Sequence, residues 1–202
     1  MKTAIDALRE LSACQSGIDE VKAAASFRAA WELSTSTSDM SWLIAHALPR
    51  ARLVRVAVRC AETCAHVAPP ECLPLLADVS AWADGARVDI NAVRDRLWAV
   101  RYAADAVISG DSATVRASRA AWEASRYEVY AVAADASYAV VYASNVNAVA
   151  ASDAVVDVVD GAAGALEKYR IQSSVFCDVI RDEVDADEVA AALGIDPDAV
   201  TT

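Results

Sequence analysis

The 202-residue chain is poor in several residue types that enzymes and membrane proteins use. It has 2 His, 2 Phe and 6 Gly, and it contains no G-x-S-x-G, H-E-x-x-H, P-loop or dinucleotide-binding glycine motif. Its longest apolar stretch, residues 131–151, is interrupted by Asp135, whereas a membrane-spanning helix needs about 18 uncharged apolar residues. We therefore expect neither enzymatic activity, nor a cofactor, nor a membrane span.

Basic residues are scarce in the last 76 positions. Acids and bases balance at 15 each up to Arg126, but from Tyr127 onward there are 14 acids and 3 bases. The net charge of -11 therefore belongs entirely to this C-terminal part, and it argues against direct binding of nucleic acid. One acidic part on a neutral body predicts a surface for a positively charged partner.

Features of exported or metal-binding proteins are also missing. Asp6, Arg9 and Glu10 lie where a signal peptide would carry an apolar run. The five cysteines are odd in number and scattered, as is typical of reduced, buried thiols. The group Cys60, Cys64, His66 and Cys72 lacks the closely spaced pair of a zinc site. We expect a cytoplasmic protein without a metal ion.

The residues that are abundant predict helices. The chain has 47 Ala and 26 Val, and apolar residues recur at three- and four-residue steps. We predict an all-α fold, either a single-domain helical bundle or a short irregular α-solenoid, with a helical domain over 1–184 and an acidic tail over 185–202. The eight or nine helices are expected near residues 3–14, 18–33, 39–48, 49–67, 71–84, 89–109, 111–147, 152–184 and 187–193, with Asp39, Asp89 and Asp111 as N-caps.

Three segments resemble a known family. They are Asp39-Met40-Ser41-Trp42-Leu43, the Arg-rich helix that ends in Cys60-Ala61-Glu62-Thr63-Cys64, and Ala81-Trp82-Ala83-Asp84-Gly85. With the Ala-rich region around Trp98 and Trp122, they resemble the Imm5-like immunity proteins of bacteria and phages, over roughly residues 40–180. The resemblance implies a helical protein that binds and neutralises a toxin.

Two groups of charged residues are candidate binding sites. Asp153, Asp157 and Asp160 share a helical face, and Asp178, Asp182, Asp185 and Glu188 continue a similar stripe. Such a stripe is either a solvated face or a site for a basic toxin or a nucleic-acid-binding protein. Arg52, Arg55 and Arg59 also share one face, and we expect pairing with Glu62, Asp78 or Asp84 rather than anion binding.

The aromatic residues leave a further question open. Trp31, Trp42, Trp82, Trp98 and Trp122 either fill the core of an Ala-rich bundle or, where exposed, form a contact surface. The leading hypothesis is a binding protein that sequesters a protein partner. The alternatives are a self-associating structural protein and a phage-type inhibitor that mimics nucleic acid.

Overall fold

The computed structural model describes residues 2–66, 68–107, 113–125 and 175–200. These residues form α-helices, and the described ranges contain two isolated β-bridges but no strand. The all-α prediction is therefore confirmed. None of the helices within these ranges is both long and apolar enough to cross a membrane.

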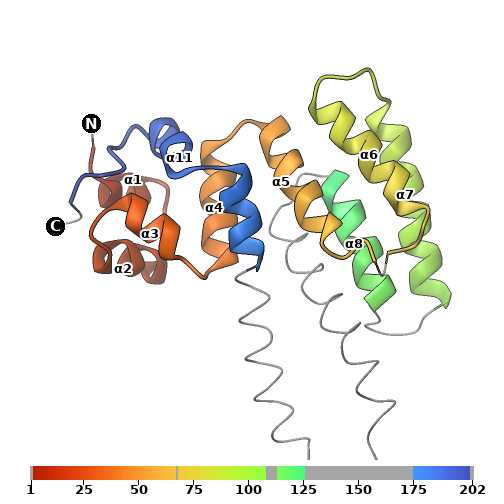
Figure 1. The fold of residues 1–202 in the computed structure, drawn as a ribbon, viewed down its shortest axis with the longest axis horizontal. Helices are drawn as coiled ribbons and strands as arrows, with labels where there is room; N and C mark the ends of the chain where they lie inside the picture. Colours follow the sequence, from red (N-terminus) through yellow and green to blue (C-terminus); the bar gives the residue numbers. More distant parts are fainter. Residues whose placement is uncertain (1, 67, 108–112, 126–174, 201–202) are drawn as a thin grey trace, which may run out of the picture.

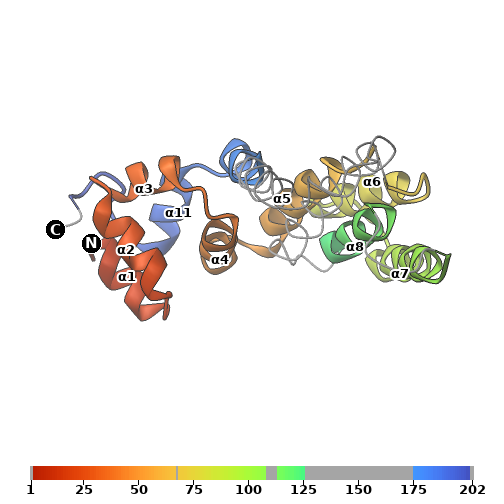
Figure 2. The same cartoon turned by 90° about the horizontal axis from the view of Figure 1, so that it is seen from below.

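The helices form two groups along the long axis of the molecule (Figures 1 and 2). One end holds α1 (Ala4–Glu10), α2 (Gln15–Ala23), α3 (Phe27–Leu33) and α11 (Ala186–Leu193). The other end holds α5 (Arg50–Glu62), α6 (Cys72–Ala83), α7 (Ile90–Val107) and α8 (Ala113–Ser125). Between them lie α4 (Thr37–Ala47) and a helix over 175–183. A connected set of buried apolar side chains runs through both groups.

The N-terminal helices depart from the prediction in several places, and the helix expected over 3–14 already ends at Glu10. One helix was expected over 18–33, but the chain forms α2 and α3 with a break at residues 24–26. The Ser26 hydroxyl accepts a hydrogen bond from the amide of Ala29, so it caps α3. Asp39 is not the N-cap of α4 either, because the hydroxyl of Ser36 accepts from the Asp39 amide and Asp39 lies in the first turn.

The helices α5, α6 and α7 lie closer to the predicted ranges 49–67, 71–84 and 89–109, which Pro69-Pro70 and Gly85 separate in the sequence. Pro49 is the N-cap residue of α5, and α6 begins two residues after Pro69-Pro70. Gly85 follows the end of α6 with a φ of +89°, a conformation that glycine adopts without strain. The Asp89 carboxylate accepts from the amides of Asn91 and Ala92, which confirms its capping role at α7. The expected cap Asp111 lies outside the described residues.

The C-terminal residues fold back onto the N-terminal group. The predicted short helix is α11, which packs on α3 and α4 and buries Val189, Ala190 and Leu193. Lys2 and Ile195 form a β-bridge, and both chain ends lie at the same end of the molecule (Figure 1). The expected acidic tail over 185–202 is therefore, up to residue 200, a packed part of the fold.

Candidate functional site

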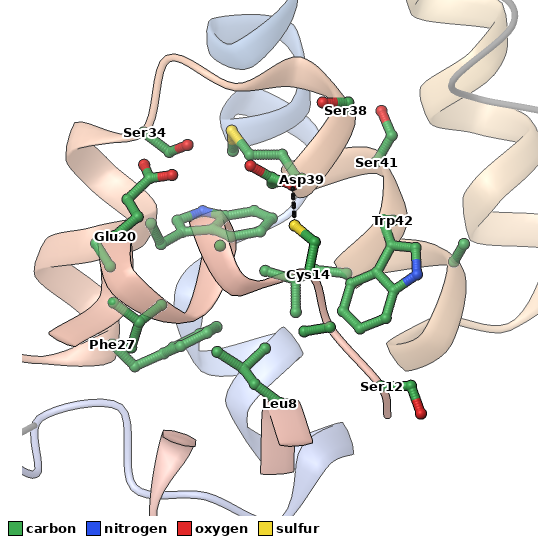
Figure 3. A pocket seen from close by; sticks show the side chains of 18 residues that line it. Leu8, Ser12, Cys14, Glu20, Phe27, Ser34, Ser38, Asp39, Ser41 and Trp42 are labelled. Carbon is green, nitrogen blue, oxygen red and sulfur yellow. Dashed lines mark hydrogen bonds between the residues drawn. The ribbon is translucent and has the colours of Figure 1, made fainter. Parts of the chain in front are cut away.

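A pocket of about 700 Å³ lies between α1, α2, α3 and α4 (Figure 3). We call it the α1–α4 pocket. Most of its wall is carbon from large side chains: Leu8, Val21, Phe27, Trp31, Met40 and Trp42. Phe27, Met40 and Trp31 are almost wholly buried in the folded chain, so the adjoining core holds their positions. The pocket is thus preformed rather than a surface depression made by mobile side chains.

The separation of α2 from α3 creates this pocket. A single helix over 18–33 would present one continuous face, whereas the break at 24–26 lets Val21 of α2 and Phe27 of α3 reach the same cavity. A β-bridge between Ser26 and Val200 holds the break in place, and the Arg28 amide donates to the carbonyl of Pro197 at 2.9 Å. The C-terminal segment therefore supports the pocket from outside.

Most polar groups lie on one side of the pocket. Figure 3 shows Glu20 and Asp39 on the side of Ser34 and Ser38, whereas Leu8 and Phe27 lie opposite, together with Ser12. The Cys14 thiol donates to the Asp39 carboxylate at 3.6 Å and lies 3.2 Å from the Ser16 hydroxyl. Among the described residues that line the pocket there are two carboxylates and no Lys, Arg or His.

Ser41 is an unusual member of the pocket wall. Only 2% of its surface is exposed, and its hydroxyl has no hydrogen-bond partner among the described residues. A buried hydroxyl without a partner costs about 1–3 kcal/mol relative to a paired one. Such a group stands out in a folded protein because buried polar atoms are nearly always paired.

The wall of the pocket has a second support in Arg181, on the helix over 175–183. Its guanidinium donates to the backbone carbonyls of Trp31, at 3.1 Å, and Ser34, so it satisfies groups at the C-terminal end of α3. The Asp178 carboxylate accepts from the same guanidinium at 2.8 Å. Asp178, a predicted partner-binding residue, thus holds a residue that braces the pocket.

The remaining predicted acids have different surroundings. Glu188 pairs with Arg52, and the Asp185 carboxylate caps α11 by accepting from the Glu188 amide at 2.7 Å. Asp182 lies beside Arg59 and Glu183 along a shallow cavity of about 210 Å³. The predicted stripe over 178–188 is therefore divided between two helices, and part of it is neutralised within the fold. Asp153, Asp157 and Asp160 lie outside the described residues.

The arginine face of α5 pairs with acids, as expected. Arg55 pairs with Asp84 at 2.6 Å, and Arg59 pairs with Glu62 at 2.8 Å. Two partners were not foreseen: Glu188 accepts from Arg52, and Glu183 accepts from Arg59 at 3.1 Å. These ion pairs join α5 to the C-terminal part, so this face holds the two helix groups together.

The five cysteines are reduced thiols in different surroundings. Burial raises the pKa of the Cys60 thiol to about 12 and that of Cys72 to about 11. Cys64 and Cys177 are also buried, whereas Cys14 is exposed at the pocket. Within the described ranges, no three His, Cys, Asp or Glu side chains are placed to share a metal ion.

The structure separates the tryptophans into core and surface. Trp31 is buried, whereas Trp98 on α7 is 47% exposed and its neighbour Tyr102 is 67% exposed. The guanidinium of Arg101 lies over the rings of Trp98, at 5.3 Å, and Trp122, at 4.5 Å. We call Trp98, Arg101 and Tyr102 of α7, together with Trp122 of the adjacent α8, the α7 aromatic face. It is a second candidate contact surface.

The sequence did not reveal the α1–α4 pocket, because its walls come from four helices whose arrangement depends on the break at 24–26. One signal was present: all five residues of the segment Asp39–Leu43, which carries part of the family resemblance, line the pocket. No protein-family model, curated protein or solved structure matches the chain.

Proposed function

We propose that the protein is a non-enzymatic binding protein that holds a protein partner, in the manner of an immunity protein, and that the α1–α4 pocket receives a side chain of that partner. The observation that carries the proposal is the pocket itself, a preformed cavity of about 700 Å³ with aromatic walls and a few polar groups on one side. Cavities of this size and lining are the usual form of binding sites.

A side chain contributes more binding free energy when it enters a pocket than when it lies on a flat surface. A side chain that fills an apolar pocket is fully removed from water, and fully desolvated anchors account for most of the binding energy at interfaces. The wall is also rigid, because Arg181 braces the end of α3 and α11 packs against α3 and α4. A rigid site loses little conformational entropy when the partner binds.

The acidic residues add a preference for a basic partner. Glu20 and Asp39 line the pocket and Glu32 lies exposed on α3, whereas the C-terminal acids are partly paired within the fold. Carboxylates near a contact surface steer a basic partner toward it and increase the association rate. The segment Asp39–Leu43 resembles immunity proteins and lines the pocket, which supports the pocket as the site of partner contact.

The test uses Gly17 of α2, which lines the pocket. A Cβ at this position would lie 3.6 Å from the Cys14 sulfur and 3.7 Å from the Asp39 carboxylate, which are ordinary contacts. Gly17→Leu therefore extends a side chain toward the pocket without moving the backbone, and Gly17→Ala is the matched control. Ala45→Phe, at an exposed position on the pocket edge, is a second blocking variant.

Peptides selected from a random displayed library against the full chain provide the ligands. We expect the selected peptides to share a large side chain with an apolar body and to bind the Gly17→Ala variant as well as the unmodified chain. Gly17→Leu and Ala45→Phe should each weaken binding by about tenfold or more. Equal binding of the selected peptides to both blocked variants, with circular dichroism unchanged, would show that the pocket is not the contact.

A second candidate function is self-association through the α7 aromatic face. Trp, Tyr and Arg side chains are enriched at protein contacts, and this face presents the exposed Trp98 and Tyr102 beside the partly buried Arg101. Sedimentation of the chain and of the Trp98→Ala/Tyr102→Ala variant tests it, with the exposed Leu73→Ala as the control. A concentration-dependent dimer that only the aromatic substitutions remove would favour this function over the first.

A further inference from the structure

We infer that the α1–α4 pocket selects an organic cation, an ammonium or guanidinium group carried on an apolar body. The inference rests on the proposed function only in taking the pocket as the binding site. It adds the chemical class of the group that enters, whether this group belongs to a free amine or to a basic side chain of a partner. The lining residues, the charges around them and one orphaned hydroxyl each support it.

The charge of the pocket has one sign. Glu20 and Asp39 are both partly buried members of the wall, and they come from different helices, α2 and α4. Of the described lining residues, none carries a positive charge. A carboxylate beside an apolar cavity interacts more strongly with a cation than one in water does, because the effective dielectric constant is lower. The two carboxylates would repel an anionic ligand.

The cations near the pocket are engaged elsewhere. Arg181 reaches the carbonyls of Trp31 and Ser34 from outside the wall, and it pairs with Asp178. Lys22, next to Val21 on α2, pairs with Asp19 at 3.1 Å. Asp39 accepts only the weak thiol hydrogen bond of Cys14 among the interactions described for its carboxylate. Within the described part of the chain, no cation pairs with Glu20 or Asp39, so their negative charge is available to a ligand.

The aromatic rings suit the same ligand. Trp31, Trp42 and Phe27 line the cavity, and the faces of such rings attract cations that have lost part of their water. The other walls, formed by Leu8, Val21 and Met40, suit the apolar body to which the charge is attached. Walls of this kind hold an amphipathic cation better than a small hydrated ion.

Ser41 supplies an independent observation. Its buried hydroxyl lies on the pocket wall without a hydrogen-bond partner among the described residues. A hydroxyl oxygen accepts hydrogen bonds, and ammonium and guanidinium groups have several N–H donors to give. This oxygen is closed to solvent in the folded chain, so a ligand N–H would satisfy it only after the wall moves to uncover it. The surface of the pocket thus offers the acceptors of Glu20 and Asp39, and the Ser41 hydroxyl lies covered within the wall.

The experiment is calorimetric titration of the full chain with three probes of similar size: 2-phenylethylammonium, 2-phenylethanol and 3-phenylpropanoate. A fourth probe, the capped dipeptide amide of Phe and Arg, presents the same chemistry as a partner side chain. We expect the ammonium to bind about tenfold more tightly than the alcohol and the carboxylate to bind most weakly. Tighter binding of the dipeptide than of the free amine would assign the site to a peptide partner, and the reverse order to a small molecule.

Charge-neutral variants give the sharper test. Glu20→Gln and Asp39→Asn should each reduce the ammonium-to-alcohol ratio severalfold, whereas Glu32→Gln, which removes an exposed acid outside the pocket wall, should leave it unchanged. Equal affinity for ammonium and alcohol, or no ammonium binding at millimolar concentration, would overturn the inference. Neither result affects the proposed function, which fails only if selected peptides still bind the blocked Gly17→Leu and Ala45→Phe variants.

Discussion

Arg52 of α5 donates from its guanidinium to the carboxylate of Glu188 on α11, at 2.9 and 3.2 Å, across 136 positions of sequence. The same guanidinium also donates to the backbone carbonyl of Glu183. One arginine therefore joins the α5–α8 group to the end of the 175–183 helix and to the start of α11. This relationship also explains why part of the C-terminal acidity does not face solvent.

We predict that this pair contributes measurably to stability. Arg52 is only 26% exposed at its side chain, and hydrogen bonds to charged groups contribute about 1.5–3 kcal/mol when partly buried. Arg52→Met should lower the free energy of unfolding by about 1–2 kcal/mol, because the carbonyl of Glu183 also loses its donor. Urea denaturation measures the change, and the double variant with Glu188→Gln gives the coupling.

The matched control is the exposed pair of Arg9 and Asp6, whose closest atoms are 3.8 Å apart on α1. Exposed pairs of this kind contribute about 0–1 kcal/mol. Arg9→Met should therefore change stability by less than about 0.5 kcal/mol. A zero coupling energy between Arg52 and Glu188 would show that the contact does not join the two helix groups.

The five thiols should differ in reactivity. Cys14 is exposed, whereas Cys60, Cys64, Cys72 and Cys177 are buried, and burial raises the pKa of Cys60, Cys72 and Cys177. Ellman's reagent applied to the native chain should titrate one thiol quickly and the other four only after unfolding. Cys14→Ser should abolish the fast phase, and a fast phase that survives this substitution would refute the assignment.

Stability should fall at alkaline pH because of Cys60. Burial raises its pKa from 9.0 to about 12, so above pH 9 the unfolded chain releases a proton that the folded chain keeps. The stabilisation is complete below pH 9 and is lost as the pH rises toward 12, with a slope of at most about 1.4 kcal/mol per pH unit from this thiol. Urea titrations between pH 8 and 11, with reductant present, measure it.

A cysteine variant isolates this contribution. Cys60→Ala should be less stable at pH 8, because it leaves a small cavity, but it should show a shallower loss between pH 9 and 11. Cys14→Ala, which removes an exposed thiol, should keep the slope of the parent chain. Identical slopes for the parent chain and Cys60→Ala would contradict the assigned pKa.

Substitution by alanine should change the stability of the fold in opposite directions at two glycines. Gly17 lies within α2 with room for a Cβ, so Gly17→Ala should stabilise the fold by about 0.5–1 kcal/mol. Gly194 ends α11 with a φ of +69°, so Gly194→Ala should destabilise it by about 1 kcal/mol, although nothing lies within 4 Å of the added Cβ. Thermal denaturation compares the two, and a shift of the same sign in both variants would contradict this account.

Local signals in the sequence predicted part of the helix order. Pro69-Pro70 and Gly85 delimit α6, and Asp89 caps α7, because each acts through its own backbone or its nearest amides. The break between α2 and α3 was missed because Ala24 and Ala25 are good helix formers. Tertiary contacts, including the bridge from Ser26 to Val200, outweigh that local preference.

The candidate site was less predictable than the fold class. The sequence singled out Asp39–Leu43 through its family resemblance. It did not indicate that Glu20, Phe27 and Trp31 lie beside this segment, because no periodicity relates α2, α3 and α4. Asp84 and Glu62, which pair with Arg55 and Arg59, were among the acids expected to pair with this arginine face. Glu183 and Glu188 were not, because their approach to α5 depends on how the C-terminal helices return.

The sequence by itself determined that the chain is helical, where several of its helices begin and end, and that its charge is concentrated toward the C-terminus, because these properties depend on composition and on neighbours a few residues apart. Only the tertiary structure decided which acids are neutralised within the fold and where the α1–α4 pocket opens. Ion pairs such as Arg28 with Asp187 and Asp198, and a cavity shared by four helices, join residues far apart in the chain. Their proximity follows from how the helices pack, and local sequence carries no record of it.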